Sequence, residues 1–196
     1  PAGRAIRWYD YLTINSYYLG LTTLSQTNGL VFPLLVQMFV GEAVKGEVLG
    51  RLRLVTLMVA LLTQALVGML SDRSTLRWGR RRPFIFIGTL LNLLFITGVG
   101  VSSGMSGAAG LSVLFAMATF SAVASNMAQG AQQGLIPDLA PMEKRGKFSA
   151  VKAILELPLP LILVSFTIAT MISNGNMWAA ILTSMGVLAG SMLLAM

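Results

Sequence analysis

Amides and hydroxyls recur along two long apolar segments of this chain, where they could hydrogen-bond a hydroxylated solute. Near the start of the chain, Asn15, Tyr18, Thr22 and Gln26 have the spacing of one helix face. Lipid would leave such groups unpaired, so this face must contact other helices or water. Amides and hydroxyls both donate and accept hydrogen bonds, which suits them to sugar hydroxyls, but they equally hold helices together. The candidate solute contacts are Asn15, Tyr18, Thr22, Gln26, Gln64, Ser125, Asn126, Gln129 and Gln133.

A lysine and a glutamate inside the fifth apolar segment could take part in ion coupling. Lys152 and Glu156 are four residues apart and therefore share one face of a helix. Placing either charge in lipid costs roughly 2.5–3.5 kcal/mol, so both must face protein or an aqueous cavity. Their pattern indicates a structural ion pair, with ion coupling as the alternative. Pro158 and Pro160 follow directly and predict a bend in this helix.

Positive charge is concentrated at residues 68–84, between two apolar runs. This stretch holds five of the 14 Lys and Arg residues. Short cytoplasmic loops carry such an excess because it sets the membrane topology, yet topology does not explain Gly68, Asp72 and Gly79. A carboxylate at a helix end beside several guanidinium groups can exchange ion-pair partners as helices move.

Composition argues against several other classes of protein. Of the 196 residues, 55% are hydrophobic and 11% are charged, and the mean hydropathy is +0.76, whereas a soluble domain is about 25% charged. The absence of Cys and His removes disulfides, thiolate chemistry and imidazole metal sites. No phosphate-binding loop or nucleophile triad is present, so we expect no enzyme activity, cofactor or metal. The net charge of +7 is spread over short loops, so we expect no nucleic acid partner.

Six apolar segments would position these residues in a lipid bilayer. We expect an all-α integral membrane protein with spans at about 11–40, 49–71, 83–103, 111–139, 148–173 and 176–196, each near the roughly 20 residues that cross a bilayer. Residues 1–10 would form a polar lead-in and 41–53 a loop of mixed charge. The chain starts without an initiator Met and ends in an apolar run, so we expect it to be part of a longer protein.

Lys and Arg lie mostly on one side of the predicted spans. They occur in the lead-in, between the second and third spans, and between the fourth and fifth spans. The opposite connections carry basic residues beside acidic ones, or no charge at all. The positive-inside rule therefore predicts a multi-pass protein of the cell (inner) membrane with both termini of this chain in the cytoplasm.

The arginine-rich stretch resembles a signature loop of the major facilitator superfamily of transporters. Gly-Met-Leu-Ser-Asp-Arg at 68–73 and Gly-Arg-Arg-Arg at 79–82 are similar to that loop. The longer string over 64–85 is similar to the branch of sucrose transporters and glycoside-pentoside-hexuronide cation symporters, and so are parts of 126–146. The resemblance implies the N-terminal six-helix bundle of a twelve-helix fold, with the C-terminal half of the same protein as its partner.

The resemblance also implies which residues gate the cytoplasmic face. In the family this loop latches that face in the outward-open state, with Asp72 docking on a helix of the other half and Gly68 permitting close approach. The arginines would exchange carboxylate partners, with Asp138 and Glu143 as local candidates. The implied gating residues are Gly68, Asp72, Arg73, Gly79, Arg80, Arg81, Arg82, Asp138, Glu143 and Arg145.

Two departures from the branch leave two functions open. Plant sucrose carriers have an acidic residue and an arginine on the fourth helix, and the matching positions here are Ala122 and Gln133. The sequence predicts a secondary active or facilitative transporter of a sugar or similar small polar solute, working by alternating access with or without a coupling cation. The alternative is a transport-inactive relative that assembles or scaffolds a larger membrane complex, for example a photosynthetic one.

Overall fold

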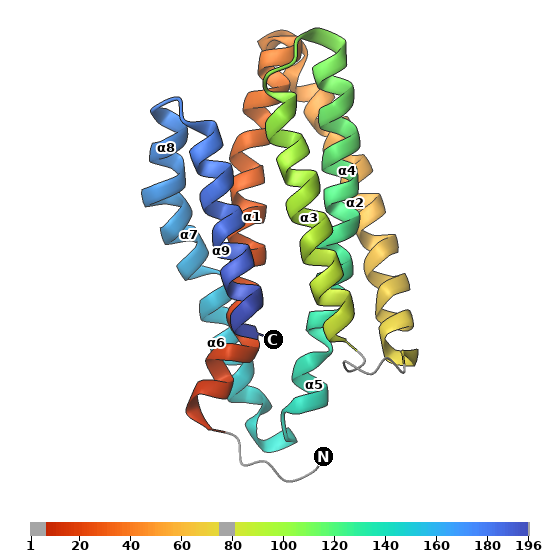
Figure 1. Cartoon of the computed structure of the whole chain (residues 1–196), viewed down its shortest axis with the longest axis vertical. Coiled ribbons are helices and arrows are strands. Elements are labelled where there is room, and N and C mark those ends of the chain that lie inside the picture. Colours follow the sequence, from red (N-terminus) through yellow and green to blue (C-terminus); the bar gives the residue numbers. More distant parts are fainter. Residues whose placement is uncertain (1–6, 75–80, 196) are drawn as a thin grey trace.

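Six helical spans form one bundle (Figure 1). The computed structural model describes residues 7–74 and 81–195. The first four spans are α1 (Trp8–Val40), α2 (Glu42–Arg73), α3 (Arg82–Ser102), and α4 (Gly107–Gln133) with the short α5 (Leu135–Leu139). The fifth consists of η1 (Met142–Lys144), α6 (Arg145–Glu156), α7 (Pro158–Leu163), η2 (Val164–Ile168) and α8 (Ala169–Ser173), and the sixth is α9 (Met177–Ala195). All six are long and apolar enough to cross a membrane, which confirms the predicted fold class.

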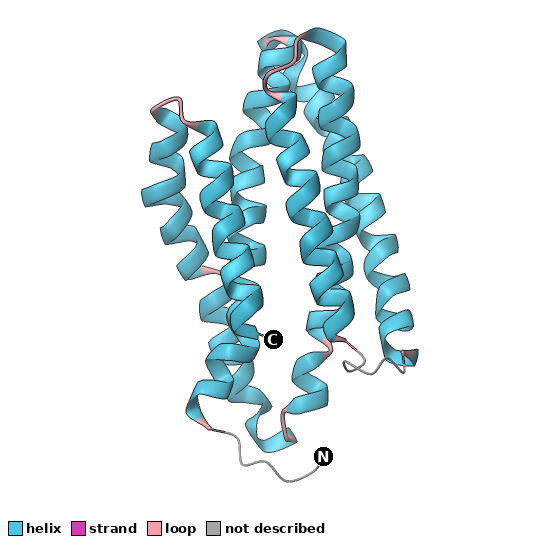
Figure 2. Ribbon diagram, in the orientation of Figure 1, coloured by secondary structure: helices cyan, strands magenta, loops and turns pink. Residues whose placement is uncertain are grey.

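The helices alternate in direction, as the colours along the chain show (Figure 1). Within the described residues, helices are joined by short turns and no strand occurs (Figure 2). The start of α1, the end of α2, the start of α3 and the α5–α6 region lie at one end of the bundle (Figure 1). The turns that follow α1, α3 and α8 lie at the other end. The end with α5 carries Arg73, Arg81 and Arg82, so it is the end that the sequence assigns to the cytoplasm.

Close helix pairs define the interior of the bundle. The most extensive packing is between α3 and α4 and between α1 and α9, while α2 packs on α4 and α6 on α1. Glycines permit two of these approaches. A Cβ at Gly20 would contact Ser191 and lie 2.7 Å from the Leu188 Cα of α9, and a Cβ at Gly88 would lie 2.8 Å from the Ala124 carbonyl of α4. Small residues are the usual means of bringing membrane helices together.

The connection after α1 differs from the prediction. Residues 41–53 were expected to form a loop, but α2 already begins at Glu42, and Gly41 alone interrupts the helix. Gly41 has a φ of +77°, which favours glycine. Charged side chains of this segment pair at helical spacing, Lys45 with Glu42 at 3.5 Å and Arg51 with Glu47. Lys45 also donates from Nζ to the Gln37 Oε1 of α1 at 2.8 Å, across the interruption. The charged segment is thus the first part of α2 and extends beyond the apolar run.

The fifth span is broken where its prolines predict. Helix α6 ends at Glu156, and α7 begins at Pro158 after a residue with φ −117° and ψ −70°. Pro160 follows two residues later, and Val164–Ile168 then form a π-helical turn. Because proline removes a backbone donor and collides with the preceding turn, the two prolines account for the break.

Candidate functional site

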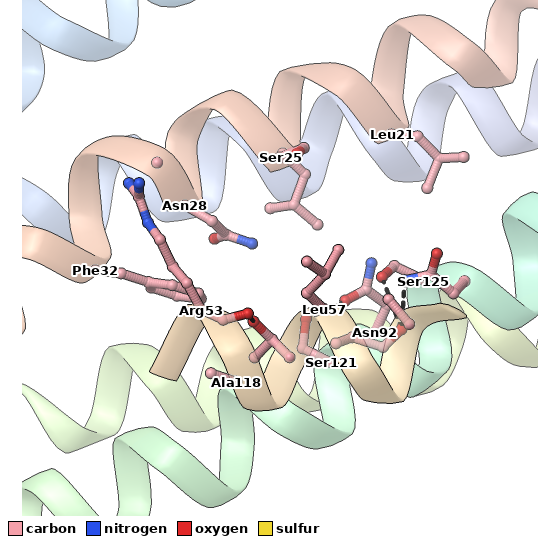
Figure 3. Close-up of a pocket in the computed structure, with 16 residues that line it drawn as sticks. Leu21, Ser25, Asn28, Phe32, Arg53, Leu57, Asn92, Ala118, Ser121 and Ser125 are labelled. Carbon is pink, nitrogen blue, oxygen red and sulfur yellow. Dashed lines mark hydrogen bonds between the residues drawn. The ribbon is translucent and has the colours of Figure 1, made fainter. Parts of the chain in front are cut away.

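A pocket of about 470 Å³ lies between α1, α2, α3 and α4 (Figure 3). It is near the middle of each long helix, since its lining includes residues 21–32 of α1, 53–60 of α2 and 118–126 of α4. Leucines and Phe32 supply apolar walls. The polar lining side chains are Ser25, Asn28, Arg53, Thr56, Asn92, Ser121, Ser125 and Asn126. This combination of apolar walls and a few polar groups is typical of a small-molecule site.

Several of these polar groups are already bound within the bundle. Ser121 donates to the Asn92 Oδ1 at 2.6 Å, a buried hydrogen bond between α4 and α3 (Figure 3). The Ser125 hydroxyl and the Asn126 amide nitrogen both donate to the Ala122 carbonyl, at 3.2 and 2.8 Å. These bonds hold the α4 side of the pocket in shape and leave the Asn126 Oδ1 as an acceptor.

The α1 and α2 side of the pocket has free donors. Among the residues that the structure describes, the side chains of Ser25, Asn28 and Arg53 have no hydrogen-bond or ion-pair partner. Ser25 and Asn28 are three residues apart on α1, and Arg53 reaches toward them from α2 (Figure 3). The free hydrogen-bonding groups therefore face each other across one side of the pocket.

The pocket contains only part of the predicted solute-binding set. Ser125 and Asn126 line it. The other predicted contacts do not, namely Asn15, Tyr18, Thr22, Gln26, Gln64, Gln129 and Gln133. Asn15 is buried and donates to the Tyr11 and Phe148 carbonyls at 2.8 and 3.2 Å, so its amide joins α1 to α6. Gln133 is exposed on the outside of α4.

The pocket is lined by a different face of α1 from the one predicted to bind solute. Residues Tyr18, Thr22 and Gln26 were chosen, whereas Ser25 and Asn28 line the pocket, on a face about 100° away. The face of Leu21, Ser25, Asn28 and Phe32 has the same spacing, so periodicity could have identified it equally well. Asn92 was missed because it stands alone in an apolar run, and Arg53 was missed because its segment was expected to be a loop.

Lys152 and Glu156 form an ion pair beside α1. The Lys152 Nζ is 3.7 Å from the Glu156 Oε2 and 4.4 Å from the centre of the Tyr18 ring, in cation–π geometry. The Tyr18 hydroxyl is buried without a hydrogen-bond partner in the described part of the chain. Three polar side chains from α1 and α6 therefore meet away from the pocket.

One of the predicted arginines links two carboxylates at the end of the bundle that carries α5. The Arg81 Nη2 is 2.8 Å from the Asp72 Oδ1, and its Nε is 2.7 Å from the Asp138 Oδ2. Its side chain is 12% exposed and packs directly on Gly134. Arg81 thus joins the end of α2 to α5, and we call Asp72, Arg81 and Asp138 the Arg81 bridge.

The other predicted gating residues occupy different surroundings. Arg145 donates to the Ala140 and Pro137 carbonyls at 3.2 and 3.0 Å, so it holds the α5–α6 turn. Four are at the surface of this end: Gly68, Arg73, Arg82 and Glu143. A Cβ at Gly68 would meet no atom within 4 Å, so the described chain leaves this surface open. Gly79 and Arg80 lie outside the described residues.

Comparisons with known proteins identify the family of this six-span chain. The family described as "MFS/sugar transport protein" matches residues 27–196. Two proteins named sucrose transport protein SUT1, from Oryza sativa subsp. japonica and subsp. indica, are each 42% identical to this chain over 50 residues. That segment is 26% of this chain and 9% of either relative. With the family matched over most of its length, the chain belongs to the MFS/sugar transport protein family.

Proposed function

We propose that the chain is the N-terminal half of a transporter that moves a sugar or similar small polar solute by alternating access. The observation that carries this proposal is the mid-bundle pocket, where amides, hydroxyls and one guanidinium face an apolar-walled space. Transporters of this kind bind solute near the bilayer midplane, between two halves. The solute would therefore bind against α1, α2 and α4, with the C-terminal half completing the site.

The Arg81 bridge would serve as part of the cytoplasmic gate. Its two ion pairs join the ends of separate spans, so relative movement of α2 and α5 must break or exchange them. Asp72 is 61% exposed and remains accessible to a helix of the C-terminal half. Both termini of this chain would then lie in the cytoplasm, and the protein in the cell (inner) membrane.

The ion pair of Lys152 and Glu156 is the candidate for coupling to a cation. The matching acid and base are missing from the fourth span, where Ala122 lines the pocket. Glu156 is a carboxylate within a span, beside the unpaired Tyr18 hydroxyl. A proton or another cation bound there would change the charge of a helix that lies next to the break at Pro158.

Uptake by the full-length protein in liposomes tests this function. A panel of labelled mono- and disaccharides should include at least one solute that accumulates faster than in protein-free vesicles. Correctly folded protein that moves none of them would contradict sugar transport. An imposed proton or sodium gradient should then raise the rate if transport is coupled.

The presence of Ala122 in the pocket favours one second candidate, a transport-inactive relative that scaffolds a membrane complex. Such a protein would co-purify stably with a large complex and would retain that association when Asp72 is replaced by Asn. A transporter should lose turnover on the same substitution.

A further inference from the structure

Arg53 gives the pocket a positive charge on one side. It is the charged member of the pocket lining, and the described residues place no Asp or Glu there. Its side chain extends from α2 to the side formed by α1, where Asn28 lies (Figure 3). The pocket is therefore polar and cationic on the side of α1 and α2. On the side of α4 it is apolar, and the amides and hydroxyls there are already hydrogen-bonded within the bundle.

Arg53 lies on α2 just before the apolar run and has no acidic partner in the described part of the chain. It is the twelfth residue of a helix that begins at Glu42, about 17 Å along the helix axis, and Leu54 begins the apolar run. Arg51, two residues earlier, pairs with Glu47, and both arginines are exposed. Arg53 has no such acid among the described residues, so its guanidinium is solvated and available to an anion that enters the pocket.

The free donors around Arg53 match the acceptors of an oxyanion. A guanidinium presents parallel N–H groups that fit the two oxygens of a carboxylate or phosphate. The Asn28 amide and the Ser25 hydroxyl add neutral donors from the facing helix. The remaining lining groups on α4 are fixed by bonds to the Ala122 carbonyl and to Asn92.

We propose that Arg53, Asn28 and Ser25 form an oxyanion subsite in the pocket, so that the solute carries a carboxylate or phosphate as well as hydroxyls. The subsite rests on the proposed transport function and names the class of solute that it serves. The acidic group binds between α1 and α2, and the hydroxyls of the same solute lie toward Ser125 and the free Asn126 Oδ1. The volume of about 470 Å³ accommodates a solute of this size.

A different partner for Arg53 would be a carboxylate of the C-terminal half, and the two explanations predict different selectivity. A structural ion pair between the halves would make Arg53 equally important for every solute. An oxyanion subsite makes it important for acidic solutes and dispensable for neutral ones of the same shape. The test therefore compares matched solutes.

Competition in liposomes containing the full-length protein provides that comparison. Uptake is measured for a neutral hexose, a hexuronate and a hexose phosphate, each also used as a competitor of the others. We expect the hexuronate or the hexose phosphate to be preferred about 10-fold or more over the neutral sugar, and the stronger of the two identifies the oxyanion. A preference for the neutral hexose, with no inhibition by either acid, would overturn the subsite while leaving sugar transport intact.

Substitution of Arg53 assigns the preference to this side chain. Arg53→Gln should weaken the binding of the acidic solute by about 10- to 100-fold and the binding of the neutral one much less. Arg53→Lys should give an intermediate loss, because lysine keeps the charge but lacks the paired N–H groups of the guanidinium. Arg51→Gln is the matched control, on the same helix and outside the pocket, and should change neither. Equal losses for all solutes in Arg53→Gln would contradict the proposal.

A binding readout separates this subsite from transport itself. The chain has no Cys, so Leu57→Cys introduces a single reporter into the pocket of this half, one turn from Arg53 and outside the three subsite residues. Alkylation of that cysteine should slow when the hexuronate or hexose phosphate is added, even if the protein moves no solute. Protection without uptake would retain the subsite and reject transport, and the absence of protection by either acid would reject the subsite.

Discussion

At the scale of single residues, the polar side chains of this bundle divide into those that hold helices together and those that remain free. Asn15 bonds two backbone carbonyls, and Ser121 bonds Asn92. Asn28 and Arg53 face the pocket without a partner in the described chain. Residue type does not separate these roles, because the same amide can do either. Only the groups that surround a side chain in the folded structure show which of the two roles it has.

The two ion pairs of Arg81 should differ in their effect on stability and transport. The Asp138 side chain is 29% exposed and Asp72 is 61% exposed, and exposed pairs stabilise weakly. We expect Asp138→Asn to lower the free energy of unfolding by about 1–2 kcal/mol, as a partly buried charge-assisted hydrogen bond is lost. Asp72→Asn should change it by less than about 0.5 kcal/mol and yet reduce uptake strongly.

Thermal unfolding of purified protein and liposome uptake measure these two effects. Glu42→Gln is the control, since Glu42 is an exposed carboxylate at the opposite end of the bundle and should alter neither quantity. Full uptake by Asp72→Asn would contradict the gating role of that carboxylate.

Lys152 and Glu156 should be coupled in both stability and ion dependence. Replacing one partner leaves the other unpaired in a span, so Lys152→Met or Glu156→Gln should each destabilise by about 1–3 kcal/mol, while the double variant should recover part of that loss. If the pair serves coupling, the double variant folds but its uptake no longer responds to a proton or sodium gradient. Retained gradient-driven uptake in the double variant would leave the pair with a structural role alone.

At the scale of helices, the length of each span was easier to predict than its rotation about its own axis or its contacts with other helices. Apolar runs of membrane length identified all six spans, because the hydrocarbon thickness fixes how many residues cross. The break after Glu156 followed from Pro158 and Pro160. The pocket face of α1 could not be chosen, since two polar faces have the same spacing and only the position of α2 selects one. The Arg81 bridge could not be predicted from the sequence, because Arg81 and Asp138 are 57 positions apart and only the fold brings them into contact.

Close packing of α1 on α9 gives a prediction at this scale. Gly20→Ala would place a methyl group 2.7 Å from the Leu188 Cα. Because a backbone atom cannot move aside cheaply, we expect a loss of about 1–3 kcal/mol in the free energy of unfolding. Gly186→Ala on α9 is the control, since its Cβ would meet nothing within 4 Å. Thermal unfolding in detergent compares the two variants, and equal stability would contradict the close α1–α9 approach.

The spacing of Gly186 and Gly190 is typical of closely packed membrane helices. A Cβ at either glycine would nevertheless meet no described atom within 4 Å, so neither approaches another described helix.

At the scale of the whole molecule, charge and pocket together suggest how the protein works. Arg73, Arg81, Arg82 and Arg145 lie at one end, and the pocket lies mid-bundle. The Arg81 bridge joins helix ends between the pocket and that side of the membrane. A solute bound against α1, α2 and α4 would reach the cytoplasm only after the two halves of the protein separate at this end. The bridge therefore sits where a gate must be, whichever solute is carried.

Orientation and access can be tested with single cysteines, because the chain has none of its own. In intact cells, an impermeant maleimide should label Met105→Cys and Asn174→Cys, which are exposed in the turns after α3 and α8. It should label Lys147→Cys, exposed near the start of α6, only after the membrane is opened. The reason is the positive-inside rule, applied to the end that carries the arginines. The opposite labelling pattern would invert the assigned topology and place the Arg81 bridge outside the cell, where a cytoplasmic gate cannot be.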